Sequence, residues 1–282
     1  MKISVNRLIF TNAINNISRA VASRATVPAL EGILIEAKED VILTGYDLET
    51  GMMKHIPADV YSEGAMVLGG KLLADLCKKM NGDIVQLEVE KDVCKISCGR
   101  ARYELPTLPA DEYPAIPKAE SKPIVLKADT LKSMIKQTIF GVSTVDVRPV
   151  HKGIMFELEN DILTAVSTDG YRLAVRKEPV KGENFNFIMQ AKAASEILKL
   201  AGDEVELIID KNHILINTDG YTIFSRLLQG EFLDYTKVLT GQHKTKITVD
   251  VKALSDTINR VAPFAPNAVK GMVSENAFAV SC

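Results

Sequence analysis

The sequence predicts an α+β fold built from a tandem repeat of units of about 120 residues. Landmarks recur 121 to 123 residues apart along the chain, and short alternating strands far outnumber amphipathic helices within each unit. Strands joined by tight turns favour antiparallel sheets, with two helices per unit packed against them. The length of 282 residues is also compatible with two or three domains.

The repeat is visible in helices, strands and turns. Phe10, Leu131 and Leu254 each lie in an amphipathic helix that follows a short alternating strand. Five further pairs recur in the same order at offsets of 121 or 122 residues: Gly32 and Gly153, Asp47 and Asp169, Lys71 and Lys192, Gly99 and Gly220, and Tyr113 and Tyr235. One coincidence is weak, whereas six in the same order indicate a duplicated module.

Each unit is expected to run strand, helix, several strands, helix and more strands. Alternation in the first unit predicts strands at 2–6, 31–36, 41–45, 66–69, 85–90, 93–98 and 102–107. Amphipathic periodicity predicts helices at 8–20, 71–81, 129–140, 191–201 and 251–262. Turn residues predict hairpins at 90–93, 159–161 and 210–212.

A polar segment with proline at both ends, 114–123, separates the first two units. The expected domains are therefore 1–120 and 121–244. Residues 245–282 match only the start of a third unit. Because half a unit cannot bury its own core, the sequence predicts an incomplete third domain, as in a fragment, an incomplete record or a degenerate copy.

Charge is divided between the predicted helices and the rest of the chain. The chain carries 34 basic and 36 acidic residues, a net charge of −2, which excludes coating of nucleic acid by bulk charge. The five helices hold ten basic and four acidic residues, so the helices carry +6 and the remainder −8. Basic helices that face a polyanion would give this division, although a single lysine-rich helix face is also common in solvent. No base-reading motif accompanies them, so any contact with nucleic acid is expected to be sequence-independent.

No metal site or cofactor is predicted. The four cysteines, Cys77, Cys94, Cys98 and Cys282, show no ligand spacing or disulfide framework and are interpreted as structural. The four histidines are scattered, and no phosphate-binding glycine loop precedes a helix, which argues against an enzyme. The chain shows no apolar run long enough to span a bilayer and no secretory leader, so a cytoplasmic location is expected.

Four motifs resemble those of one known family, the bacterial sliding clamps, or β subunits of DNA polymerase III. Arg24 with Thr26-Val-Pro-Ala-Leu30 is similar to the family's entry into its first long strand. Leu43-Thr-Gly-Tyr-Asp-Leu-Glu49 and Thr168-Asp-Gly-Tyr-Arg-Leu-Ala174 are similar to two turn motifs. Gly230-Glu-Phe-Leu-Asp-Tyr235 is similar to a fourth, and the resemblance runs from residue 1 to about 262.

The resemblance implies tandem DNA-clamp domains, each with antiparallel sheets outside and two helices lining a ring. It implies a non-catalytic accessory subunit that encircles double-stranded DNA without sequence specificity. A head-to-tail homodimer with a complete third domain would close such a ring. The DNA polymerase III catalytic subunit and the clamp loader would bind a groove through linear peptide motifs. A scaffold that binds partner peptides without DNA is the alternative function.

Three sets of residues follow from the helix charges and the resemblance together. The expected DNA contacts are Arg24, Lys71, Lys78, Lys132, Lys136, Lys192 and Lys199. The resemblance implies a peptide-binding groove at Arg148, Val150, Thr168, Gly170, Tyr171, Arg172 and Leu173. It also implies a dimer interface at Tyr103 and Leu105, for which a core role is the alternative, while a plain surface loop is the alternative for Arg24. Asp169, which recurs as Asp47, is expected to be structural.

Overall fold

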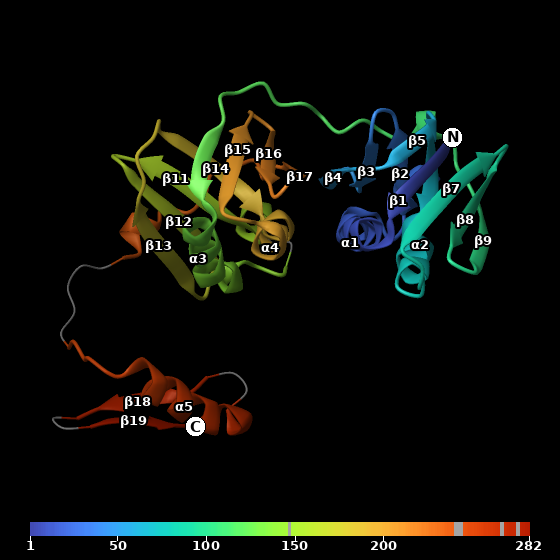
Figure 1. Cartoon of the computed structure of the whole chain (residues 1–282). Coiled ribbons are helices and arrows are strands. Elements are labelled where there is room, and N and C mark those ends of the chain that lie inside the picture. The colour runs from blue at the N-terminus through green and yellow to red at the C-terminus, as the bar shows by residue number, and fades with distance from the viewer. Residues whose placement is uncertain (146–147, 240–244, 266–267, 275–276) are drawn as a thin grey trace. The chain divides into compact units, whose positions relative to one another are not determined.

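The computed structural model describes residues 1–145, 148–239, 245–265, 268–274 and 277–282 (Figure 1). The chain forms two compact units. The first compact unit, Met1–Leu233, contains both complete sequence repeats, and the second is Asp234–Cys282; from here on, "first unit" and "second unit" mean these compact units. The expected boundary at residue 244 lies outside the described residues.

The first unit contains two consecutive sets of strands and helices. The first set comprises β1 (Lys2–Asn6), α1 (Arg7–Ile17), β2 (Gly32–Ala37), β3 (Val41–Tyr46), β4 (Thr50–Ile56), β5 (Asp59–Ser62), β6 (Gly64–Gly69), α2 (Gly70–Cys77), β7 (Ile84–Glu90), β8 (Val93–Cys98) and β9 (Ala101–Pro106). The second comprises β10 (Ile124–Lys127), α3 (Ala128–Thr138), β11 (Gly153–Glu159), β12 (Ile162–Thr168), β13 (Leu173–Pro179), β14 (Phe185–Gln190), α4 (Ala191–Leu200), β15 (Glu204–Ile209), β16 (His213–Thr218) and β17 (Tyr221–Arg226).

The two sets have the same topology, which confirms the predicted tandem α+β design. Strand order β4-β3-β2-β6 in the first set is repeated as β13-β12-β11-β14 in the second, and β1-β7-β8-β9 is repeated as β10-β15-β16-β17. All these pairs are antiparallel. Strand β17 also pairs with β4, so one eight-stranded sheet runs through both sets.

Two of the repeated landmarks have a clear physical cause. Gly32 and Gly153 begin equivalent strands, where a Cβ atom would lie 2.3 Å from Val67 Cγ1 and 2.4 Å from Met189 O respectively. Asp47 and Asp169 begin equivalent turns, and each Oδ1 accepts two backbone N–H bonds from residues two and three positions later. The structural interpretation of Asp169 is therefore confirmed.

Strands β4 and β5 are absent from the prediction. The segment 50–56 has no regular alternation, since its first three residues are all buried where the sheet continues into β17. The Gly99 and Gly220 landmark is also shifted by one residue, because the flanking strands repeat at an offset of 120. Gly99 is the first residue of its hairpin turn, whereas Gly220 is the second of its own, after Asp219.

The helices form as their sequences predict. The Asn6 side chain caps α1 by accepting from Leu8 N and Ile9 N. Phe10 and Ile14 project from one face of that helix into a core that includes strands of both sheets. The opposite face of α1 remains exposed to solvent.

The second unit contains α5 (Val251–Val261) and a hairpin of β18 (Lys270–Val273) and β19 (Phe278–Ser281). Asp250 caps the helix by accepting from Ala253 N at 2.8 Å. Leu254 and Ile258 occupy the positions in α5 that Leu131 and Ile135 occupy in α3. Leu131 and Ile135 are buried, whereas Leu254 and Ile258 are only partly buried. A shallow apolar hollow lies between α5 and β19.

Candidate nucleic-acid interface

Helices α1, α2, α3 and α4 lie on the same side of the strands in the first unit (Figure 1). Lys71 on α2 and Lys136 on α3 are exposed, and neither makes an ion pair with another described residue. Lys79, just after α2, is exposed in the same way. Arg24 is exposed on the loop that follows the first helix. These cations are accessible to an anionic partner.

The other four expected DNA contacts have partners within the chain. Lys78 pairs with Asp75 at 3.3 Å along α2, and Lys199 pairs with Glu196 at 2.8 Å along α4. Lys132 Nζ donates to the carbonyl oxygen of Ala201, at the end of α4. Lys192 pairs with Asp47 in the turn between β3 and β4. Lys132 and Lys192 therefore tie elements together, a role that the helix charges alone do not reveal.

Glu196 was not among the expected site residues, although it holds two cations. It is only 5% exposed and accepts from Arg19 Nε and from Lys199 Nζ, both at 2.8 Å. Arg19 lies just after α1 and Glu196 lies on α4, so the ion pair joins the two halves of the unit on their helix side. In the sequence Glu196 is the one acidic residue of an otherwise alanine- and leucine-rich helix, and no motif marks it.

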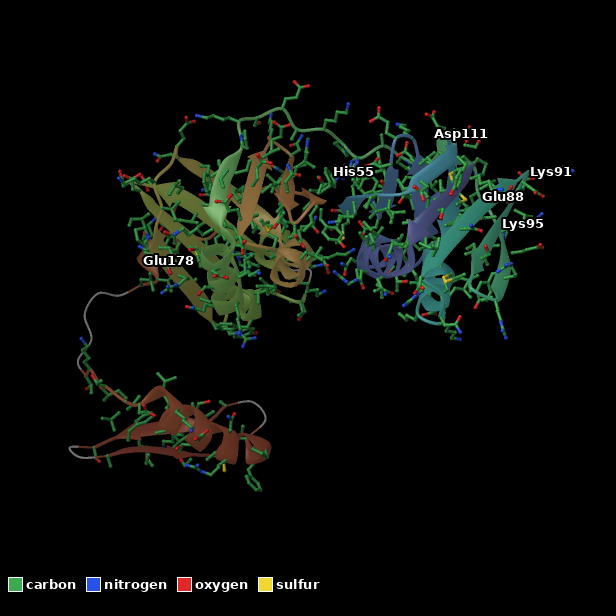
Figure 2. The ribbon with its side chains drawn as sticks, viewed as in Figure 1. His55, Glu88, Lys91, Lys95, Asp111 and Glu178 are labelled. Carbon is green, nitrogen blue, oxygen red and sulfur yellow. The ribbon has the colours of Figure 1, made fainter. Side chains whose placement is uncertain are left out.

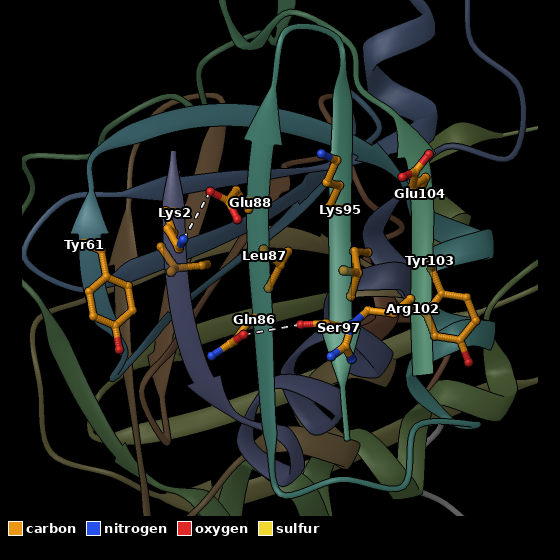
Figure 3. Close-up of a pocket in the computed structure, with 12 residues that line it drawn as sticks. Lys2, Tyr61, Gln86, Leu87, Glu88, Lys95, Ser97, Arg102, Tyr103 and Glu104 are labelled. Atoms are coloured by element: carbon orange, nitrogen blue, oxygen red, sulfur yellow. Dashed lines mark hydrogen bonds and ion pairs between the residues drawn. The ribbon is translucent and has the colours of Figure 1, made fainter. Parts of the chain in front are cut away.

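On the outer face of the sheet β5-β1-β7-β8-β9, basic and acidic side chains lie next to one another and neutralise each other. Lys2, Glu88, Lys95 and Glu104 oppose one another in a row across four strands, with alternating sign. Lys2 and Glu88 pair at 3.1 Å, and these side chains line a hollow of about 400 Å³ (Figure 3). Such a face offers little net attraction to a polyanion.

The expected groove residues lie on two segments. Thr168–Leu173 forms the turn between β12 and β13, while Arg148 and Val150 lie at the short helix Pro149–Lys152. The ring of His151 in that short helix is affected by the charges of both Arg148 and Asp169, which places the two segments near each other. Burial and the Arg148 charge lower the pKa of His151, so its ring is neutral near pH 7.

The Asp169 carboxylate holds the turn rigid. It accepts from the backbone N–H groups of Tyr171 and Arg172 at 3.0 Å and from Arg172 Nε at 2.9 Å, which lowers its pKa to about 2. Thr168 Oγ1 donates to Arg172 O at 2.8 Å. Gly170 has φ +91° with open space around it, so the turn conformation itself requires glycine. This geometry projects Tyr171 fully into solvent.

Two aromatic side chains add apolar surface to the groove segments. Phe140 is exposed beneath the Arg172 guanidinium, 6.0 Å from its ring centre. Phe232 packs edge-on against His151 at 5.8 Å. Phe140 has no distinctive motif in the sequence and is missed there, whereas Phe232 lies within the fourth clamp-like motif.

Tyr103 and Leu105 lie on β9, at one edge of its sheet. Within the described residues β9 pairs only with β8. Leu105 is 8% exposed and belongs to the core, whereas Tyr103 is half-buried at the edge (Figure 3). The equivalent strand of the second set, β17, pairs along this same edge with β4.

Within the described part of the chain, no group of side chains could hold a metal ion, and no helix is long and apolar enough to cross a bilayer. Cys77, Cys94 and Cys98 are buried, and burial raises the pKa of the Cys77 and Cys94 thiols to about 12. These three are core residues, as expected, whereas Cys282 is exposed and its structural interpretation stays a prediction.

Repeated α+β modules that share a sheet and carry basic helices on one side define the architecture of a DNA sliding clamp. Comparison with known proteins supports this assignment to the sliding clamps. The model of the "DNA polymerase III beta subunit, N-terminal domain" matches residues 1–117, and that of the "central domain" matches residues 125–234. The chain belongs to the family of DNA polymerase III β subunits, which are non-catalytic sliding clamps.

Relatives match over almost the whole chain. The beta sliding clamp of Halalkalibacterium halodurans is 34% identical over 279 residues, covering 92% of this chain and 73% of that protein. The crystal structure of the Bacillus subtilis clamp superposes with a TM-score of 0.94 at 28% identity, covering 99% of this chain and 80% of the other. The β subunit from Thermotoga maritima superposes with a TM-score of 0.89 at 27% identity, covering 99% and 79%.

Proposed function

We propose that the chain acts as a replication processivity factor, which encircles duplex DNA without sequence specificity and tethers DNA polymerase III and other partners. The observation that supports this most is the contrast between the two sides of the fold. The helix side carries accessible cations, whereas the outer sheet face pairs its own charges. A topological link needs only weak, non-specific contacts, and spread lysines provide them.

The proposed DNA contacts fall into two groups. Arg24, Lys71 and Lys136 meet the phosphates directly, and Lys78 does so while sharing its charge with Asp75. Lys132, Lys192 and Lys199 are held by partners within the chain, so they contribute mainly to the shape and potential of the surface. Reversing the charge of these three lysines would break contacts within the fold as well as any contact with DNA. A test of DNA binding should therefore use other lysines.

The internal repeat supports a proposal for ring assembly. We infer domains at 1–120, 121–244 and 245–282, of which the last is the start of a third clamp domain. Since β17 pairs with β4, the equivalent strand β9 is suited to pair with a β4-like strand of another subunit. Tyr103 and Leu105 would then lie in a head-to-tail dimer contact, Tyr103 through its half-buried side chain and Leu105 through its backbone, since the Leu105 side chain belongs to the core. A heterologous interface that closes in this way forms a ring.

The peptide groove is proposed at Arg148, Val150, Thr168, Gly170, Tyr171, Arg172 and Leu173. Arg172 and Leu173 give it a donor beside an apolar wall. With a fluorescent peptide carrying the clamp-binding motif of the polymerase catalytic subunit, Arg172→Ala and Leu173→Ala should each weaken binding by about 1–3 kcal/mol. Lys181→Ala, on a different loop, is the control, and unchanged binding by both groove variants would refute this placement.

A titration of labelled duplex DNA tests the proposed function. Lys71→Glu/Lys136→Glu should weaken binding strongly without lowering the unfolding temperature, since neither side chain has an ion-pair partner among the described residues. Lys91→Glu, on the β7–β8 hairpin away from the helices, is the matched control and should change little (Figure 2). Equal loss in both variants, or no loss, would contradict the proposal. Absent DNA binding with intact peptide binding would favour a scaffold.

A further inference from the structure

A polar hollow of about 400 Å³ opens between α1 and α4, where the two halves of the first unit meet. Helix α1 contributes a row of asparagines to its lining. The polar residues of the lining are Asn12, Asn15, Asn16, Lys54, Lys199, Asp219 and Tyr221. The hollow therefore collects donors from both halves at a place on the helix side of the fold.

The walls of the hollow are fixed by hydrogen bonds. Asn16 Nδ2 donates to Tyr221 Oη at 2.7 Å, and Arg19 Nη1 donates to Asn16 Oδ1 at 2.8 Å. Lys54 Nζ donates to the carbonyl oxygen of Asp219 at 2.6 Å and lies 4.2 Å above the Tyr221 ring. These groups are in place before a ligand arrives, which lowers the entropic cost of binding.

Several donors in the hollow remain available. Among the described residues, the side-chain amides of Asn12 and Asn15 make no hydrogen bond. Lys199 donates one N–H to Glu196, and its half-exposed ammonium has two more. Lys54 and Lys199 outweigh the carboxylate of Asp219, so the lining carries a net positive charge of one.

The exposed face of α1 differs from the faces of the other three helices. It carries no lysine, and its outermost residues are Leu8, Ile9 and Asn12. A polyanion that follows the helix side past α1 therefore meets neutral amide donors on that helix, with the nearest ammonium groups, Lys54 and Lys199, on other elements. An amide N–H bonds a phosphate oxygen without displacing a condensed counterion of its own.

We propose that this hollow is a subsite for one phosphodiester group of the DNA backbone. The phosphate oxygens accept N–H bonds from the amides of Asn12 and Asn15, and the Lys199 ammonium supplies the nearby charge. This inference rests on the proposed function, since it requires a duplex along the helices. It adds a distinct property, because the contact made by the amides is largely insensitive to salt.

Titration of a labelled duplex at several salt concentrations tests the subsite. Asn12→Ala/Asn15→Ala should weaken binding about tenfold at every salt concentration, as expected for two lost hydrogen bonds, with an unchanged slope of log K against log salt. Lys136→Ala should instead make that slope shallower by about 0.9. Gln86→Ala removes an amide from the outer face of β7 and should change neither quantity.

The outcomes separate the two proposals. If the unaltered chain binds no duplex, the proposed function fails. If it binds but the double asparagine variant binds equally well, the subsite is refuted while the function stands. A shallower slope in that variant would show that the asparagines act by placing a cation, and would overturn the neutral-donor contact. Folding is checked by thermal unfolding, and alanine favours a helix more than asparagine does. Asn12→Ala alone, on an exposed side chain, provides a second variant.

Discussion

Glu196→Gln removes the negative charge that Arg19 and Lys199 share between the two halves of the first unit. The carboxylate is almost fully buried, whereas the side chains of Arg19 and Lys199 are 30% and 51% exposed. Glutamine keeps the shape and one acceptor oxygen, so the change tests charge rather than packing.

The stability effect follows from these exposures. A buried charge-assisted hydrogen bond contributes about 1.5–3 kcal/mol, but the half-exposed Lys199 partner is screened and adds little. A loss of about 2 kcal/mol is expected, with a fall of about 4–8 °C in the unfolding temperature for a unit of this size. Circular dichroism during heating measures it. Glu183→Gln is the control, since its pair with Lys122 is highly exposed and should contribute little.

The same variant should bind duplex DNA more tightly at low salt. Each freed cation that reaches a phosphate steepens the slope of log K against log salt by about 0.9, so two freed cations give up to about 1.8. Fluorescence anisotropy of a labelled duplex measures this slope. Unchanged stability would refute the role of Glu196 at the junction, and reduced stability with an unchanged slope would show that Arg19 and Lys199 do not face DNA.

Two further predictions concern the equivalent turns. Leu48 has φ +74° where the second turn has Gly170, so Leu48→Gly should be more stable than Leu48→Ala by about 1 kcal/mol in thermal or urea unfolding; equal stabilities would contradict strain at this position. Because the pKa of Asp169 is lowered to about 2, its ionised form stabilises the fold above about pH 4, and this contribution is lost as pH falls towards 2. Acid unfolding should therefore depend less on pH in Asp169→Asn, and identical profiles would argue against the carboxylate as the support of that turn.

Much of the fold could be predicted because the sequence contains two copies of it. Alternation and amphipathic periodicity locate most strands of the first repeat and all five helices, and the repeat supports assignments that one copy would leave weak. The exceptions among the strands of the first repeat are β4 and β5. Strand β4 is buried at the junction with β17, so its side chains do not alternate between core and solvent. A strand that pairs with another module does not show the alternation of apolar and polar residues by which strands are recognised in a sequence.

The candidate site was less predictable for a similar reason. A count of helix charges finds the lysines but not their partners, and Lys132 and Lys192 prove to hold elements together. Glu196 and the asparagines of α1 acquire their roles only where the two halves meet. Sequence spacing describes short stretches of one module, whereas Lys132 contacts a residue 69 positions away and Lys192 contacts Asp47, 145 positions away in the other module.

Lysine footprinting tests most directly whether duplex DNA lies along the helices. The chain is acetylated with and without a saturating duplex, and the modified lysines are identified by mass spectrometry. Lys71, Lys79 and Lys136 should be protected by DNA, while Lys91 and Lys95 on the β7–β8 hairpin should react equally in both samples (Figure 2). Protection of the hairpin lysines with unprotected helix lysines would contradict a clamp that holds DNA by its helices.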